Sequence, residues 1–261
     1  MEASPILAYF GHHKCGTQWI TSIVEDVCDA AGLRAVRHDN SDRFQGDIIS
    51  YRQDNPFDFW CYINADYCFV RGLDVRGFHV VRDPRDVIVS GYFSHLTSHP
   101  VDRWPQLRCY RSFLQSLSKD EGILREMEFS GPALYAMLFW NPSTPGVREI
   151  HFEDLIQDSE DRFCELLEEM GILPNRISET VVRGIVGRHA FQCMSGGRQP
   201  GEENAAHHFR KGVPGDWRNH FKASHIDYFK KLFNPVLIKL GYETSEGWTN
   251  ELSEARIASV L

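Results

Sequence analysis

Short apolar runs alternate along the chain with stretches in which apolar residues recur at helical spacing. Residues 6–10 (ILAYF) predict a buried strand, and residues 19–27 place Trp, Ile and Val side chains three and four positions apart, as on one helix face. Residues 78–81 (FHVV) predict another buried strand, followed by a helical pattern over residues 87–92. This alternation predicts an α/β fold with a central parallel sheet of about five strands flanked by helices, as in phosphate-loop nucleotide-binding proteins.

The turn after the first predicted strand contains two glycines, Gly11 and Gly16. A strand, a glycine loop and a helix N-terminus together surround a phosphate with backbone N–H groups. The spacing approaches the mononucleotide loop GxxxxGK[ST], but Thr17 stands where that motif has its lysine, and Lys14 lies inside the loop. The alternative is a tight turn with an incidental lysine. Cys15, at the helix N-terminus, is predicted to have a lowered pKa and to be sensitive to oxidation.

The second predicted strand is followed by the sequence RDPRDVIVSGY. Asp83 is suited to cap a helix N-terminus, and Pro84 is suited to its first position. Arg82 leaves the strand end and Ser90 follows about two helical turns later, so a charged and a neutral donor could reach one anion. Alternatively, Arg82 pairs with Asp83 or Asp86 and Ser90 is a small packing residue.

A third stretch, FRKGVPGDWRNHF, carries two adjacent cations before a glycine. Arg210, Lys211 and Gly212 can present side chains and backbone N–H groups to a phosphate together. A solvated surface charge pair is the alternative.

The set HHKCGTQW, RDPRDVIVSGY and FRKGVPGDWRNHF resembles the soluble, cytosolic-type sulfotransferase family. Members transfer a sulfuryl group from 3′-phosphoadenosine 5′-phosphosulfate (PAPS) to an acceptor hydroxyl or amine. The segment HFEDL (residues 151–155) and the pair Phe191 and Met194 also fit, and the motif order agrees from about Leu7 to about Phe233.

The resemblance implies a role for each matching residue. The loop that holds the 5′-phosphosulfate corresponds to Lys14, Cys15, Gly16, Thr17 and Gln18, and the aromatic residue that stacks on adenine to Trp19. The 3′-phosphate site corresponds to Arg82 and Ser90 with the closing turn Arg210, Lys211 and Gly212. Apolar contacts to adenine are expected from Phe191 and Phe209, although these rings could equally belong to the core.

Sulfuryl transfer is an in-line displacement in which catalysis consists mostly of positioning and charge stabilisation. Lys14 is expected to stabilise charge growing on the bridging oxygen as the nucleotide leaves. The sulfuryl group carries less charge than a terminal phosphoryl group, so a lysine can replace Mg²⁺. The sequence contains no CxxC and no HExxH, and we expect no metal.

The acceptor needs a general base, and here the chain departs from the family. Cytosolic members carry a histidine at a K-T-H-type strand end, whereas residues 60–66 read WCYINAD. The candidates are His38, then Asp66, then Asp39. A histidine titrates near neutral pH, whereas an aspartate would need a raised pKa.

Length, net charge and cysteine usage restrict the class of protein and the compartment that we expect. The 261 residues are expected to form one domain over residues 1–261, and the net charge of −8 argues against a general nucleic-acid binder. No secretory signal or long apolar run is present, and the scattered cysteines suit a reducing compartment, so we expect a cytoplasmic protein without a membrane span. Residues 42–58 and 97–108 predict loops on the acceptor side, and residues 196–208 a lid ordered by cofactor.

Two other functions stay open. One is a metal-dependent nucleotide or small-molecule kinase, for which Asp83 is the only hint of a magnesium-holding residue. The other is a protein that binds PAPS or its product without catalysis, since the K-T-H histidine is missing. The acceptor is expected to be a small-molecule, glycan or lipid alcohol, and the abundant aromatic residues would suit an apolar or aromatic one.

Overall fold

A computed structural model describes residues 4–102 and 104–249. It divides into two compact units. The first contains the chain up to Arg82 together with Phe139–Ala190, and the second contains Asp83–Leu138 together with the chain from Phe191 onward. That residues 1–261 form a single domain stays a prediction.

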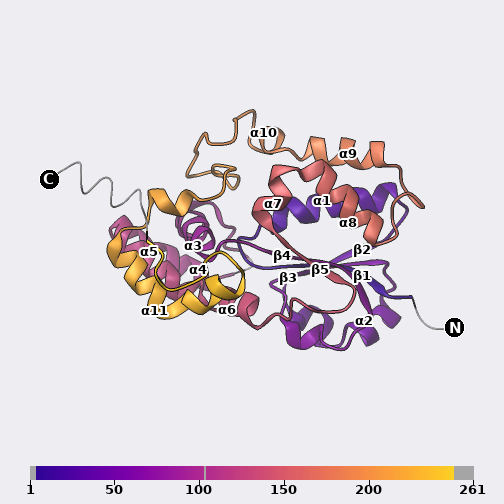
Figure 1. Cartoon of the computed structure of the whole chain (residues 1–261), viewed down its shortest axis with the longest axis horizontal. Coiled ribbons are helices and arrows are strands. Elements are labelled where there is room, and N and C mark those ends of the chain that lie inside the picture. The colour runs from indigo at the N-terminus through magenta and orange to yellow at the C-terminus, as the bar shows by residue number, and fades with distance from the viewer. Residues whose placement is uncertain (1–3, 103, 250–261) are drawn as a thin grey trace. The chain divides into compact units, whose positions relative to one another are not determined.

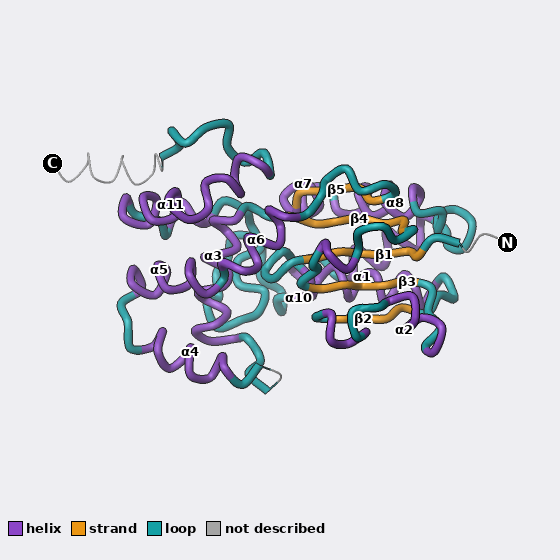
Figure 2. Tube along the Cα trace, turned by 90° about the horizontal axis from the view of Figure 1, so that it is seen from below, coloured by secondary structure: helices purple, strands orange, loops and turns teal. Residues whose placement is uncertain are grey.

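The first unit is built on a parallel five-stranded sheet with the order β2-β3-β1-β4-β5 (Figure 2). The strands are β1 (Ile6–Gly11), β2 (Ala35–His38), β3 (Phe59–Ile63), β4 (Val75–Val81) and β5 (Val147–His151). The predicted α/β fold with about five parallel strands is therefore confirmed.

Helices cover both faces of this sheet. In Figure 1, α1 (Thr17–Ala30), α7 (Phe152–Gln157), α8 (Ser159–Glu169) and α9 (Glu179–Arg188) lie on one face, and α2 (Ile48–Asp54) lies on the other. Neighbouring side chains of a strand point to opposite faces, so Tyr9 and Phe10 enter two different apolar clusters. Both clusters exclude water from the strands that end at the candidate site.

The second unit is helical. It contains α3 (Pro84–Phe93), α4 (Gln106–Gln115), α5 (Lys119–Phe129), α6 (Gly131–Phe139, whose last residue belongs to the first unit), α10 (Phe191–Met194) and α11 (Ala223–Lys239). As predicted, Asp83 caps α3, because its side chain accepts from the Arg85 N–H, and Pro84 is the first helical residue. At its other end α3 continues into a π-helical turn, Ser94–Ser98.

Some local expectations were wrong. Residues 42–58 are not a plain loop, because Asp47 caps α2 by accepting from two backbone N–H groups. Residues 97–108 likewise include the end of the π-helical turn and the start of α4. Within residues 4–102 and 104–249, no helix combines the length and the apolar character needed to cross a bilayer.

Candidate cofactor site

The loop between β1 and α1 turns tightly through left-handed backbone. Gly16 caps α1 with φ 75°, and Lys14 has φ 64°. A Cβ at Gly16 would lie 2.3 Å from the Phe152 ring, so glycine is required there both by backbone conformation and by space. The loop is closed by a hydrogen bond from the Cys15 N–H to the His12 carbonyl at 3.1 Å. The predicted strand, glycine loop and helix N-terminus are thus present.

Arg82 joins the second stretch to this loop. Its Nη1 donates to the Lys14 carbonyl at 2.8 Å, and its guanidinium lies 5.0 Å from the centre of the Phe152 ring. Its Nε is buried and has no hydrogen-bond partner among the described residues. A buried donor without a partner costs about 1–3 kcal/mol, so a ligand that places a hydrogen-bond acceptor next to this Nε would remove that cost.

Trp19 is anchored rather than loosely exposed. Its Nε1 donates to the His189 carbonyl at 2.8 Å, and its ring makes edge contacts with Phe152 and Phe163 at 6.1 and 5.6 Å between centroids. Gln18 is exposed and Thr17 is partly exposed. Stacking of Trp19 on adenine stays a prediction.

The prediction for the Cys15 thiol was wrong. Cys15 is completely buried, and burial raises its pKa to about 12, although the charge of Arg82 acts in the opposite direction. The penalty for placing a thiolate among apolar atoms outweighs both the helix N-terminus and the nearby guanidinium. The sequence shows the position in the loop but not which way the side chain points.

We therefore expect Cys15 to resist alkylation in the folded protein. With a raised pKa the thiol stays protonated at pH 8, whereas Cys68, Cys109 and Cys193 are exposed to reagent. Iodoacetamide labelling at pH 8, read by peptide mass spectrometry, should modify these exposed cysteines first and Cys15 only in denaturant. Rapid labelling of Cys15 in native protein would contradict the burial described here.

A buried histidine pair that sequence reasoning missed supports the start of the loop. His12 Nε2 and His79 Nε2 lie 2.7 Å apart, and His79 Nδ1 lies 3.0 Å from a Glu149 carboxylate oxygen. Burial first, and His79 second, hold the pKa of His12 well below its usual range. Through His79 and Glu149, the pair links the first residue of the loop to β4 and β5.

In the second unit, Ser90 lies partly exposed on α3, and Asp86 ties this helix to the third stretch. The Asp86 carboxylate accepts from the Gly215 N–H at 2.6 Å and from the Trp217 N–H at 2.9 Å. Arg85 lies 4.0 Å from the Trp217 ring centre and pairs with Asp83 at 2.8 Å. The repeated aspartates of the sequence RDPRD were the signal from which this role of Asp86 could have been predicted.

The basic turn is not a solvated surface pair. Arg210 and Lys211 have side chains only 12% and 19% exposed, and each pairs with the Asp216 carboxylate at 2.5 Å. Arg210 also pairs with Glu203 and lies 4.6 Å from the Phe93 ring centre on α3. Because both cations already share one carboxylate, a phosphate bound at this turn would compete with Asp216.

Asp216 is ionised in this setting. Burial opposes its charge, but hydrogen bonds from His220, Lys211 and Asn219 and the charge of Arg210 prevail and hold its pKa well below the usual range. The sequence analysis did not identify Asp216 as the partner of the basic turn, although Asp216 follows that turn closely in the sequence.

The two predicted apolar contacts lie beside the same turn. A Cβ at Gly212, whose φ is 72°, would lie 2.4 Å from the Phe191 ring, so ring and glycine are packed together. Arg198 donates to the carbonyls of Phe209, Arg210 and Glu202 at 2.5, 2.7 and 2.8 Å. Residues 196–208, predicted to be a lid, are therefore joined to the turn by Arg198, by the Arg210–Glu203 ion pair and by backbone hydrogen bonds from Gly201 and Asn204.

The geometry disfavours all three candidate bases. Trp60 Nε1 donates to His38 Nδ1 at 3.0 Å, His38 is 4% exposed, and burial lowers its pKa. Asp39 pairs with Arg43 at 3.2 Å on the surface, and Asp66 accepts from the Cys68 N–H at 2.9 Å as a helix cap. Each carboxylate or imidazole thus has a local structural partner, and the assignment of the base to them stays a prediction.

Comparison with known proteins agrees with this fold and these motifs. The family model described as a sulfotransferase domain matches residues 72–241. Human sulfotransferase 2A1 is 26% identical over 184 residues, covering 63% of this chain and 57% of that protein. Mouse sulfotransferase 2A6 is 24% identical over 175 residues, covering 61% and 55%. The chain spans about half the length of the curated relatives it matches.

The fold is also similar to that of a solved sulfotransferase. A crystal structure of mouse sulfotransferase SULT7A1 complexed with PAP superposes with a TM-score of 0.60 at 17% identity, covering 89% of this chain and 84% of that one. The likeness at this identity concerns the parallel-sheet fold. With a family match over more than half of its length, the chain belongs to the sulfotransferase domain family.

Proposed function

We propose that this protein transfers a sulfuryl group from PAPS to an acceptor hydroxyl or amine. The single observation that carries the proposal is the Arg82 contact to the phosphate-loop carbonyl of Lys14, which joins two of the three motif stretches at one point. Family membership supports the same activity. The fold positions Lys14 in the loop, where a lysine can stabilise charge on a leaving group.

The residues of each unit fit a polyanionic nucleotide. In the first unit the buried, unpaired Nε of Arg82 is a donor suited to an anionic oxygen. In the second, Arg210 and Lys211 converge on a carboxylate, which has the charge of the phosphate that would replace it. When bound, PAPS would supply the activated sulfuryl group; the residues proposed to contact it are Lys14, Thr17 and Arg82 in the first unit, and Ser90 and the basic turn in the second.

A kinase receives less support. Asp83, the candidate magnesium-holding residue, caps α3 and pairs with Arg85 through both carboxylate oxygens. A carboxylate used in this way is poorly placed to hold a metal ion together with a nucleotide. Comparing the binding of PAP with the binding of ATP and Mg²⁺ distinguishes a sulfotransferase from a kinase.

We expect Arg82→Ala to weaken binding of adenosine 3′,5′-bisphosphate (PAP), the product, by about 10- to 100-fold. Hydrogen bonds to charged groups contribute about 1.5–3 kcal/mol, and the variant also releases the Lys14 carbonyl. Calorimetric titration of wild type and variant without added metal measures both affinities.

Arg71→Ala, which removes an exposed arginine from the same unit, is the matched control and should bind like wild type. A wild type that prefers ATP with Mg²⁺ over PAP would overturn the sulfotransferase proposal. An equal loss of PAP affinity in Arg82→Ala and Arg71→Ala would show that the effect comes from net charge alone.

A further inference from the structure

The basic turn of the second unit lies against one aromatic ring of α3, and a third cation lies against the same ring. The Arg210 guanidinium lies 4.6 Å from the centre of the Phe93 ring, and the Lys119 ammonium lies 5.8 Å from it. Both distances fall within the range at which a cation is attracted to a ring face. Phe93 therefore brings the basic turn and the start of α5 to one place.

The neutral donor predicted for the 3′-phosphate lies on the same side of α3 as this ring. Ser90 precedes Phe93 by three residues, a spacing that makes two side chains neighbours on one helix face. Ser90 is partly exposed, and Lys119 is exposed as the first residue of α5. A hydroxyl, a guanidinium and an ammonium of the second unit thus lie along one face of α3.

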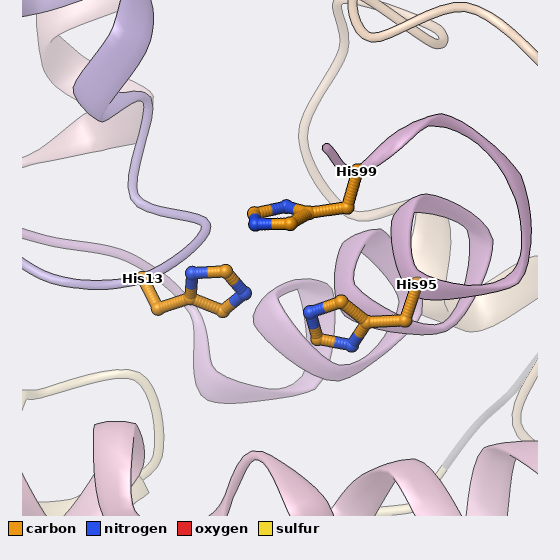
Figure 3. A group of neighbouring side chains, drawn as sticks. All are labelled: His13, His95 and His99. Atoms are coloured by element: carbon orange, nitrogen blue, oxygen red, sulfur yellow. The ribbon is translucent and has the colours of Figure 1, made fainter. Parts of the chain in front are cut away.

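The segment that precedes the basic turn is attached to the end of the same helix. There α3 continues into the π-helical turn Ser94–Ser98, and Figure 3 shows His95 on this turn and His99 just after it. Thr97 Oγ1 donates to the Ala205 carbonyl at 3.0 Å. Residues 196–208 are therefore held beside α3 as well as beside the basic turn.

The two cations of the basic turn are already neutralised by carboxylates. Arg210 pairs with Glu203 and Asp216, and Lys211 shares Asp216. Two positive charges therefore face two negative ones. A phosphate monoester carries a charge of about −1.5 to −2 at pH 7, so this turn alone offers it no surplus of positive charge.

Lys119 has the positive charge that this balance lacks. Among residues 4–102 and 104–249 its ammonium forms no ion pair, because the neighbouring Asp120 pairs with Lys222 instead. Burial lowers the pKa of Lys119, while the carboxylates of Glu203, Asp120 and Asp216 act in the opposite direction. The ammonium is thus close enough to the carboxylates of the turn to feel their charge, yet it is bound to neither.

We propose that Lys119 binds the 3′-phosphate of the nucleotide and determines the preference for a nucleotide that carries this group. The inference rests on the proposed function, which supplies PAPS and PAP as ligands. When the phosphate replaces Asp216 as the acceptor of the basic turn, the Lys119 ammonium turns from the Phe93 ring toward it. A lysine has a flexible four-carbon stem, so this movement requires no change of the backbone.

The test compares the affinities of PAP and of adenosine 5′-monophosphate (AMP), which lacks the 3′-phosphate. Both are titrated calorimetrically without metal into wild type, Lys119→Gln and Lys119→Arg. Lys119→Gln should weaken PAP binding by about 3- to 10-fold and leave AMP binding unchanged, since only PAP has the group that Lys119 contacts. Lys119→Arg keeps the charge and should keep most of the PAP affinity.

Two further measurements separate this role from a general effect of charge. Lys231→Gln, which removes an exposed lysine of α11 in the same unit, is the matched control and should bind PAP like wild type. PAP, but not AMP, should protect Lys119 from acetylation, read by peptide mass spectrometry, whereas Lys231 should be acetylated equally with either nucleotide. The PAP affinity lost in Lys119→Gln should shrink as NaCl is raised from about 50 to about 500 mM, because salt screens exposed charges.

The outcomes distinguish this inference from the proposed function. A wild type that prefers PAP to AMP, together with a Lys119→Gln variant that keeps the whole preference, overturns the role of Lys119 and leaves the sulfotransferase proposal intact. An equal loss of PAP and AMP affinity in Lys119→Gln also overturns it. A wild type that binds PAP no better than AMP has no site for a 3′-phosphate, and this result overturns the proposed function and the inference together.

Discussion

Replacing Lys14 with alanine is expected to lower kcat for transfer from PAPS by about 10²- to 10³-fold while partly sparing PAP binding. Removing one donor aimed at charge that develops in a transition state typically has this effect. The backbone consequence is small, since alanine keeps a Cβ at the left-handed Lys14 position and keeps the carbonyl that Arg82 uses. Steady-state kinetics and calorimetry on the same preparations separate the two quantities.

Lys231→Ala is the matched control, because Lys231 is an exposed lysine on α11 and its loss changes the net charge equally. It should leave kcat unchanged. If Lys14→Ala turned over like wild type but bound PAP much more weakly, Lys14 would be a binding residue, and another group would have to stabilise the leaving nucleotide.

Gly77→Ala should destabilise the first unit by about 3 kcal/mol or more, placing it among the exceptional single substitutions. A Cβ at Gly77 would lie 1.8 Å from the Ala8 carbonyl oxygen, which is backbone of the central strand β1. The clash cannot be relieved by a side-chain rotation, so β1 and β4 must separate. Urea unfolding followed by circular dichroism measures the change in the free energy of unfolding.

Gly184→Ala is the opposite case within the same unit. Gly184 lies in α9, and a Cβ there meets no atom within 4 Å, so alanine should stabilise by about 0.5–1 kcal/mol through helix propensity. Equal effects at the two glycines would mean that β1 and β4 are not packed as described.

Several parts of the candidate site follow from local sequence. The apolar run before Gly11, the glycines of the loop and the helical spacing after Thr17 predicted the strand, turn and helix that the structure contains. Asp83 and Pro84 predicted the start of α3 in the same way. Capping, glycine geometry and apolar periodicity act over a few residues, so a single sequence carries them.

Contacts between residues far apart in the sequence could not be predicted from such local patterns. Arg82 reaches a carbonyl 68 positions away, and Asp86 reaches backbone N–H groups of Gly215 and Trp217, 129 and 131 positions away. Many carboxylates could in principle have taken these roles, and only the folded chain selects among them. Family resemblance identified the stretches but not the contacts that join them.

The sequence by itself determined the α/β class, the glycine loop with Lys14 inside it and the order of the three candidate anion-binding stretches, because these depend on short-range sterics and spacing. Tertiary structure decided that Cys15 is buried with a raised pKa, that Asp216 holds both cations of the basic turn, and that Lys119 and Arg210 meet at the Phe93 ring. The physical reason is that desolvation and charge pairing depend on which side chains the packed chain brings together, and no local pattern encodes that choice.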